Sequence, residues 1–392
     1  MQHTTTQTFS RRFDRPIVSV VFVATAYLLF ILVRLAVHDW DLSYFVTAGD
    51  KFTDPKLAPR SLHVIPDAHG HDGQFYYRFA LDPFTNTITD YGITLDLPAY
   101  RHQRILYPVL ANLLSIGILS LVPFWMIAIN YFGLCAIAWT ASKLMQSHGL
   151  HALWGLAIAC YPGFILTLAR DFTEILAAAF VLAAVLSATR QQPWRAAILL
   201  SFGVLARETS LLVAVALGLA GIIARMRGDR TRAFAVYAIP VSIGIGWQLY
   251  LRYNWGHFAA SDTGTMGLPF TSFVQSIIEK MSFASGQQTA AFFQMLLVAG
   301  FAVSVGIAAR SSRANLHEKL SWLLYCGLAC VVSGNVWSED WSFLRNLWEL
   351  YAFGAIILAA SHSRARAPMF GCWAVLWLFE FALRMDVHKL WG

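Results

Sequence analysis

The chain has 392 residues, of which 57% are hydrophobic and only 13% are charged, with a formal net charge of +7. Soluble domains carry about 25% charged residues, so this composition excludes an ordinary soluble protein and predicts an integral membrane protein. In so apolar a chain, excess basic residues are typical of cytoplasmic loops, and we expect no nucleic-acid partner. The five cysteines lie in apolar runs without CxxC spacing, which favours packing roles over disulfides or metal sites.

The chain begins with a short polar tail and a first membrane span. Residues 1–16 include Arg11, Arg12 and Arg15, as is typical of a cytoplasmic tail. Residues 17–37 are apolar and long enough to cross a hydrocarbon core of about 30 Å. No small-residue cleavage site follows, so we expect an uncleaved span and not a removed signal peptide.

The longest polar segment follows this span, from about residue 38 to residue 104, and many apolar runs come after it. We identify no soluble domain, low-complexity run or internal repeat. The pattern predicts an all-α polytopic membrane protein with about 10–11 membrane helices and a large first extracytoplasmic loop. The later apolar runs cover about 105–121, 123–142, 151–169, 175–189, 196–224, 234–252, 287–309, 320–336, 347–361 and 369–385.

Basic clusters between the apolar runs orient the chain. If all of them are cytoplasmic, together with the N-terminal tail, basic residues greatly outnumber acidic residues on that side, as the positive-inside rule predicts. The 38–104 loop then faces the extracytoplasmic side. The clusters are Arg190/Arg195, Arg225/Arg227/Arg230/Arg232, Arg310/Arg313/Lys319 and Arg364/Arg366.

This orientation requires two irregular membrane segments. Two full spans between residues 105 and 142 would reverse the later loops, so we expect 105–121 to be a tilted or re-entrant helix and 123–142 the true span. The run 196–224 begins and ends among cytoplasmic arginines. It therefore predicts two short helices, each reaching about half the bilayer, that meet at Arg207-Glu208-Thr209.

The centre of the polar segment is the candidate catalytic stretch. Asp72 follows His71 and is flanked by Gly70 and Gly73, which would let the backbone turn and aim a carboxylate into a cavity. Asp72 is the candidate general base, and His71 and Gln74 are candidates to bind a sugar or orient the carboxylate. The alternative is a solvated Asx-turn. His69 and His71 have no third strong metal ligand in sequence, so a divalent metal is an open alternative that we do not favour.

The same predicted face gathers further charged residues, which are costly near hydrocarbon unless paired or functional. Arg170 and Arg207 are candidates to hold a phosphate, since guanidinium groups match its oxygens. The alternative is internal pairing of Arg207 with Glu208 or Glu174, and of Arg170 with Asp171. Further candidates for the binding site are Arg101, Arg104, Asp171, Glu174, Glu208 and Arg345. Glu339-Asp340 is either a cation or sugar site or a solvated turn.

These motifs resemble the GT-C superfamily of membrane glycosyltransferases, above all bacterial members with a His/Tyr-Asp-Gly-Gln first-loop signature, and more distantly the mannosyltransferases with Trp-Asp-Gly. The resemblance covers roughly residues 17–230. The matching stretches are His71-Asp72-Gly73-Gln74-Phe75-Tyr76-Tyr77, Tyr100-Arg101-His102-Gln103-Arg104-Ile105-Leu106-Tyr107-Pro108, Arg170-Asp171-Phe172-Thr173-Glu174 and Leu205-Ala206-Arg207-Glu208-Thr209.

The resemblance implies an inverting transfer of a sugar from a polyprenyl-phosphate donor to a glycan or glycolipid acceptor outside a bacterial inner membrane. Asp72 would take the proton from the acceptor hydroxyl, and Arg207 would stabilise the leaving phosphate. Residues 17–232 would form the catalytic membrane module, and 233–392 would complete the cavity. Two alternatives stay open: a flippase for a lipid-linked sugar, or an envelope polysaccharide polymerase or ligase that relies more on the 337–346 loop.

Overall fold

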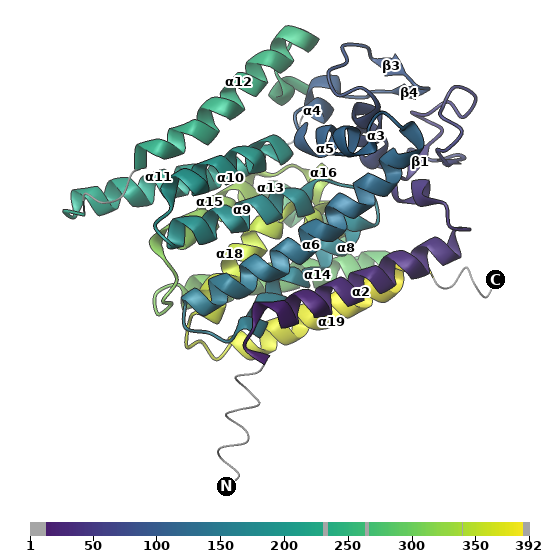
Figure 1. Ribbon diagram of the computed structural model, residues 1–392. Coiled ribbons are helices and arrows are strands. Elements are labelled where there is room, and N and C mark those ends of the chain that lie inside the picture. The colour runs from purple at the N-terminus through teal and green to yellow at the C-terminus, as the bar shows by residue number, and fades with distance from the viewer. Residues whose placement is uncertain (1–12, 230–233, 263–265, 339, 387–392) are drawn as a thin grey trace.

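Six helices of the described chain are long and apolar enough to cross a membrane. The computed structural model describes residues 13–229, 234–262, 266–338 and 340–386, and these residues are mostly helical, with very little sheet (Figure 1). The all-α prediction is confirmed at this level. The six segments contain α2 (Pro16–Val37), α6 (Val122–Ser147), α11 (Leu211–Met226), α12 (Ala238–Trp255), α14 (Gly286–Ala308) and α19 (Arg366–Arg384).

Shorter helices pack between these long ones. One expected run, 151–169, is not a single helix. A 3-10 turn at Ala152–Gly155 leads into α7, and α7 is separated from α8 because Pro162 lacks an amide hydrogen and holds Tyr161 in extended backbone (φ −69°, ψ 129°). The shorter helices are α5 (Leu106–Ser115), α7 (Leu156–Ala159), α8 (Pro162–Leu168), α9 (Glu174–Thr189), α10 (Pro193–Ala206), α13 (Thr271–Lys280), α15 (Leu316–Val331), α16 (Gly334–Trp337), α17 (Asp340–Asn346) and α18 (Trp348–Ala359).

The two segments expected to be irregular are a short helix and an interrupted one, and their placement in a membrane stays a prediction. Helix α5 has only 10 residues and ends at Ile116 in the left-handed region (φ 51°), so it reaches only about 15 Å. Helices α10 and α11 are separated at Arg207, whose backbone is extended (φ −159°, ψ 124°). The second arm is longer than expected. Together with a 3-10 turn at Glu208–Ser210 it forms a 19-residue segment, which reaches about 28 Å and so most of a hydrocarbon core.

The polar segment between α2 and α5 folds over one end of the helices (Figure 1). It contains two small sheets and two helices, α3 and α4. Every residue of α3 is buried, because the rest of this segment and α5 cover the helix. The elements are β1 (Ala48–Gly49), parallel to β2 (Val64–Ile65), β3 (Thr89–Asp90), antiparallel to β4 (Ile93–Thr94), α3 (Gly73–Leu81) and α4 (Pro98–His102).

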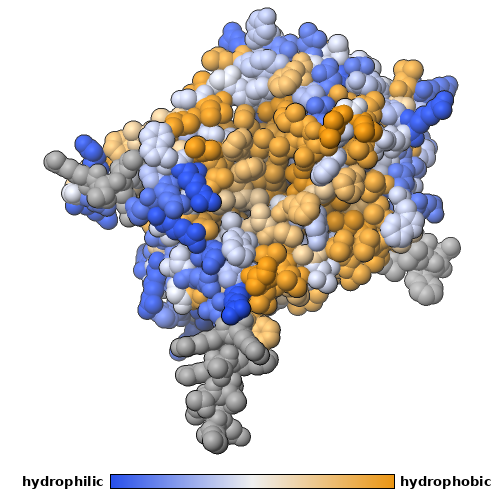
Figure 2. Space-filling model, viewed as in Figure 1, coloured by the Kyte–Doolittle hydropathy of each residue, from blue (hydrophilic) through white to orange (hydrophobic). Residues whose placement is uncertain are grey.

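The loops assigned to the cytoplasmic side lie together at the opposite end. Asp14 accepts a 2.7 Å hydrogen bond from the amide of Ala152, and His148 lies 3.0 Å from Glu318. On the face shown in Figure 2, a broad apolar surface lies between the two polar ends. Arg230 and Arg232, which were assigned to the same side, fall outside the described residues.

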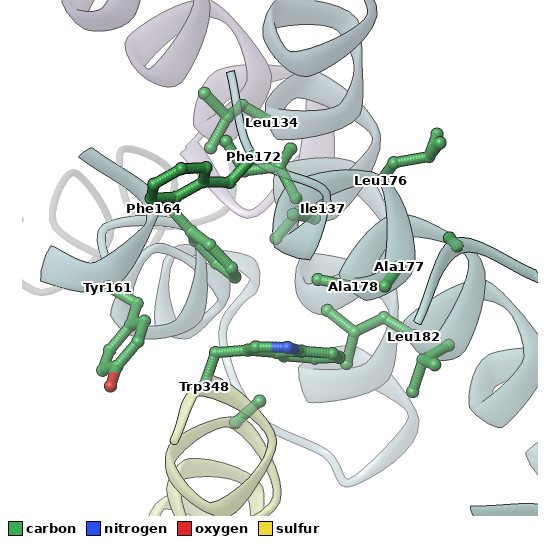
Figure 3. Close-up of a cluster of buried hydrophobic side chains, with 14 of the residues drawn as sticks. Leu134, Ile137, Tyr161, Phe164, Phe172, Leu176, Ala177, Ala178, Leu182 and Trp348 are labelled. Carbon is green, nitrogen blue, oxygen red and sulfur yellow. The ribbon is translucent and has the colours of Figure 1, made fainter. Parts of the chain in front are cut away.

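A buried aromatic cluster packs around the start of α18. The Trp348 side chain, at the start of α18, is fully buried, and its ring centroid lies 6.2 Å from that of Phe164, in a cluster that also contains Phe172 and Leu182 (Figure 3). Truncating an aromatic side chain in such a core costs about 3–5 kcal/mol. This packing fixes the start of α18, and with it the polar residues immediately before it.

Candidate active site

Asp72 lies directly before α3, at a turn that only glycines can accommodate. Gly70 has φ +69°, which L side chains rarely adopt. A Cβ atom on Gly73 would lie 2.3 Å from the carbonyl oxygen of Arg170 and 2.6 Å from that of Val46. The start of α3 therefore packs directly on the turn after α8, and this brings the first loop against the membrane helices.

Two arginines hold the carboxylate of Asp72. Arg101 Nη1 lies 2.9 Å from Oδ1, and Arg345 Nη2 donates a 2.7 Å hydrogen bond to Oδ2. Burial alone would raise the pKa of Asp72, but the two guanidinium groups outweigh it and hold the pKa well below the usual range. Asp72 is therefore ionised at physiological pH.

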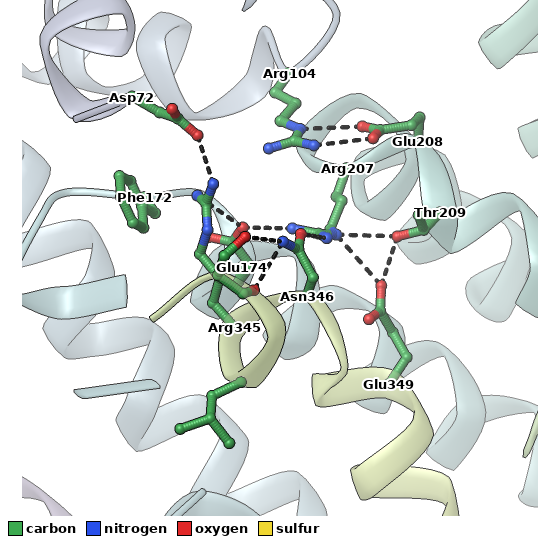
Figure 4. A network of polar contacts seen from close by, with 12 residues as sticks. Asp72, Arg104, Phe172, Glu174, Arg207, Glu208, Thr209, Arg345, Asn346 and Glu349 are labelled. Atoms are coloured by element: carbon green, nitrogen blue, oxygen red, sulfur yellow. Dashed lines mark hydrogen bonds and ion pairs between the residues drawn. The ribbon is translucent and has the colours of Figure 1, made fainter. Parts of the chain in front are cut away.

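Arg345 connects Asp72 to a second carboxylate, Glu174 (Figure 4). Its Nη1 lies 3.5 Å from Glu174 Oε1, and its guanidinium lies over the ring of Phe172 at 4.1 Å. Glu174 also forms an ion pair with Arg207. A continuous chain of contacts thus links Asp72 to Arg207, two residues that the sequence placed at opposite ends of one site.

Arg207 is held by residues from its own turn and from the C-terminal part of the chain. Its Nη2 donates a 2.6 Å hydrogen bond to Asn346, and its Nε lies 3.0 Å from Thr209 and 3.4 Å from Glu349. Thr209 in turn donates to Glu349. Asn346 and Glu349 were not identified from sequence, although a carboxylate inside the expected span 347–361 was a usable signal.

Arg104 and Glu208 form another ion pair of the site. Arg104 donates through Nε and Nη2 to the two carboxylate oxygens at 3.1 Å and 3.0 Å, which is the two-point geometry that guanidinium groups favour. Its Nη1 donates a 3.0 Å hydrogen bond to the hydroxyl of Tyr76. The pair thereby connects the break between α10 and α11 to the covered helix α3.

These side chains surround a cavity of about 790 Å³, within the size range of ligand pockets. One part of its wall is charged and the other is apolar, from α15 and the segment after α12. The charged wall includes Asp72, Arg101, Arg104, Arg207, Glu208, Arg345 and Glu349. The apolar wall includes Phe258, Met266, Leu328, Ala329 and Val332.

Several candidate residues lie beside this cavity and are not among the residues that line it. Gln74 accepts hydrogen bonds from the amide of Gly49 (3.2 Å) and the hydroxyl of Thr53 (3.0 Å), so its amide holds the loop together. Asp171 has a left-handed backbone (φ 50°) and accepts from Tyr107. The ring of His71 packs edge-on against Phe172, and burial together with the positive charge of Arg170 lowers the pKa of His71 to about 3.

The arginines that line the cavity are already paired with carboxylates. Arg207 pairs with Glu174, which is one of the two internal partners that the sequence suggested, while Glu208 pairs with Arg104 instead. An anionic ligand would therefore have to exchange with carboxylates for these guanidinium groups. Such exchange is feasible because phosphate and carboxylate use the same two-point geometry.

Two further observations concern metal binding and similarity to known proteins. Within the described ranges, no group of three or more His, Cys, Asp or Glu side chains is arranged to hold a metal ion. Glu339 falls outside those ranges. No family model, curated protein or solved structure matches this chain.

Proposed function

We propose that this protein is a membrane glycosyltransferase that moves a sugar from a polyprenyl-phosphate donor to an extracytoplasmic glycan or glycolipid acceptor. The observation that carries the proposal is one cavity with an ionised carboxylate, several arginines and an apolar wall. A lipid-linked sugar phosphate has the matching parts: a polar sugar, an anionic leaving group and a hydrocarbon tail.

The proposed setting is the inner membrane of a bacterium, with the N-terminus cytoplasmic and the cavity on the outer side. Support comes from the apolar surface between two polar ends and from the arginine-rich loops at the end opposite the cavity. The shorter apolar helices complete about 10–11 membrane helices in this proposal. In such a setting the tail of the donor reaches the cavity from the outer leaflet.

In the proposed reaction, an acceptor hydroxyl oxygen attacks C1 of the sugar on the face opposite the phosphate. The new C–O bond forms as the bond between C1 and the phosphate oxygen breaks, and the phosphate leaves with the electron pair. The hydroxyl proton passes to Asp72, and guanidinium groups of Arg207 and Arg104 stabilise the phosphate. The configuration at C1 is inverted.

The low pKa of Asp72 has a role in the proposed reaction. A carboxylate held by two arginines is a weak base. If the donor phosphate draws one guanidinium away from Asp72, the pKa of Asp72 rises and its basicity increases. Donor binding would thus activate the base only when a substrate is present.

The deciding experiment compares Asp72→Asn with the wild type in host cells that lack the chromosomal copy. Lipid-linked sugars and envelope glycans are measured by mass spectrometry at equal protein levels. We expect Asp72→Asn to lose the glycosylated product and to accumulate the lipid-linked donor. Asp67→Asn, an equal change at a side chain that is 98% exposed in the same loop, is the matched control. Full product formation by Asp72→Asn would overturn the proposed base, and movement of the donor with no covalent product would favour a flippase.

A further inference from the structure

Arg101 is held by a second carboxylate, Asp96, which was not identified from sequence. Asp96 accepts from Arg101 Nε at 2.9 Å and from Nη2 at 2.7 Å. This two-point contact fixes the plane of the guanidinium. The remaining nitrogen, Nη1, is the one that contacts Asp72.

A second hydrogen bond holds the carboxylate of Asp96 independently of Arg101. Its Oδ1 also accepts a 2.7 Å hydrogen bond from the amide of Leu97, the residue directly before α4. Arg101 lies on the same short helix, and its guanidinium packs over the ring of Phe75 at 4.7 Å. The carboxylate of Asp96 and the ring of Phe75 therefore set the position of Nη1.

The other arginine on Asp72, Arg345, divides its contacts between several groups. It donates a 2.7 Å hydrogen bond to Asp72, its Nη1 lies 3.5 Å from Glu174, and its guanidinium lies over the ring of Phe172 at 4.1 Å. Its geometry to Glu174 lacks the two-point contact that joins Arg101 to Asp96. An anion entering the cavity would therefore exchange more readily for Arg345 than for Arg101.

We propose that Asp96 is a positioning residue that holds Arg101 against one oxygen of Asp72 while the other oxygen is released to the acceptor hydroxyl. This inference rests on the proposed function, since it takes Asp72 as the base. Arg101 keeps Oδ1 fixed because Asp96 stays bound to it. Oδ2 becomes available when the donor phosphate draws Arg345 away. Without the Asp96 charge, Arg101 would turn to grip both oxygens of Asp72 and block the base.

The test is a double-mutant cycle between Asp96→Asn and Arg101→Lys. Activity is measured per folded molecule in membrane vesicles, with the polyprenyl-phosphate lipid fraction extracted from host membranes as donor and product detected by mass spectrometry. We expect Asp96→Asn to lower kcat about 10- to 100-fold, a typical effect of misplacing a reactive group, with little change in the KM for donor. If Asp96 acts through Arg101, the double variant is no slower than Arg101→Lys alone.

Two further variants separate a positioning role from a structural one. Asp96→Glu restores the charge and should recover part of kcat, and Asp67→Asn should match the wild type. Wild-type kcat in Asp96→Asn, or strictly multiplicative losses in the cycle, would overturn the role of Asp96. If Asp72→Asn is inactive in that case, the proposed function is retained and only the role of Asp96 is rejected. If Asp72→Asn is active, the proposed function is rejected as well.

Discussion

Arg345 donates a 2.7 Å hydrogen bond to Asp72 across 273 residues of sequence. The contact joins α17, near the end of the chain, to the turn before α3 in the first loop. Both residues line the wall of the cavity. The C-terminal third of the chain is thus a part of the candidate site.

Removing Arg345 should destabilise the protein and stop sugar transfer. In Arg345→Ala, Asp72 stays buried with Arg101 as its remaining contact among those described above, and Glu174 keeps Arg207. Breaking one partner of a buried ion pair costs about 3–5 kcal/mol. We expect a lower thermal midpoint in detergent and loss of product in membranes.

Two related variants define what Arg345 supplies. Arg345→Lys keeps the charge but cannot span Asp72 and Glu174 with one compact ammonium group, so only part of the stability should return. Arg364→Ala removes an arginine from an exposed position and should behave as wild type. A wild-type midpoint in Arg345→Ala would contradict the importance of the contact.

The break between α10 and α11 could be predicted because Arg207-Glu208-Thr209 interrupts an otherwise apolar run. The fragmentation of 151–169 was missed, although Pro162 was a visible signal, because the run is apolar throughout. The burial of α3 could not be seen locally. It depends on distant parts of the loop and on α5 packing over residues that are individually polar or aromatic.

The candidate site was predictable only in part, for a similar reason. Asp72 and Arg207 stand out because charges in an apolar chain are few. Asn346 and Glu349 lie far from both residues in sequence. Asp96 lies in a part of the polar segment that has no distinguishing motif. Gln74 belongs to the same short motif as Asp72, yet its side chain holds the loop, since neighbouring residues at the start of a helix point in different directions.

Gly73→Ala should disturb the base without changing any charge. Its added Cβ would lie 2.3 Å from the Arg170 carbonyl, so α3 and Asp72 must move. Overpacking of this kind costs about 1–3 kcal/mol, and more where backbone must shift. We expect a lower thermal midpoint and reduced transfer. Gly327→Ala, in the middle of α15 with open space around its Cβ, is the control and should be neutral or stabilising.

His71 should make stability depend on pH. Its pKa falls from 6.5 to about 3 in the folded protein, so between these values the unfolded chain binds a proton that the folded chain does not. Stability therefore rises with pH across this window, is complete above about pH 6.5, and is lost as the pH falls toward 3. Thermal midpoints of wild type and His71→Gln at pH 5 and pH 7.5 test this. The wild-type midpoint should drop at pH 5 by more than that of His71→Gln; equal drops would refute the assignment.

Exchanging the charges of Arg104 and Glu208 separates a structural ion pair from a phosphate-binding group. Arg104→Glu alone places two carboxylates together at the cavity wall, and Glu208→Arg alone places two guanidinium groups there, so both should be destabilised. The double variant can re-form the ion pair, and neighbouring residues in one ion pair typically couple by about 0.5–3 kcal/mol. We expect its thermal midpoint to recover toward wild type, except for the contribution of the lost hydrogen bond from Arg104 to Tyr76.

Sugar transfer by the double variant should stay low, because the positive charge has moved from the first loop to the break between α10 and α11. Recovery of both stability and transfer would mean that Arg104 serves the ion pair alone, and would leave Arg207 as the phosphate-binding arginine on this side of the cavity.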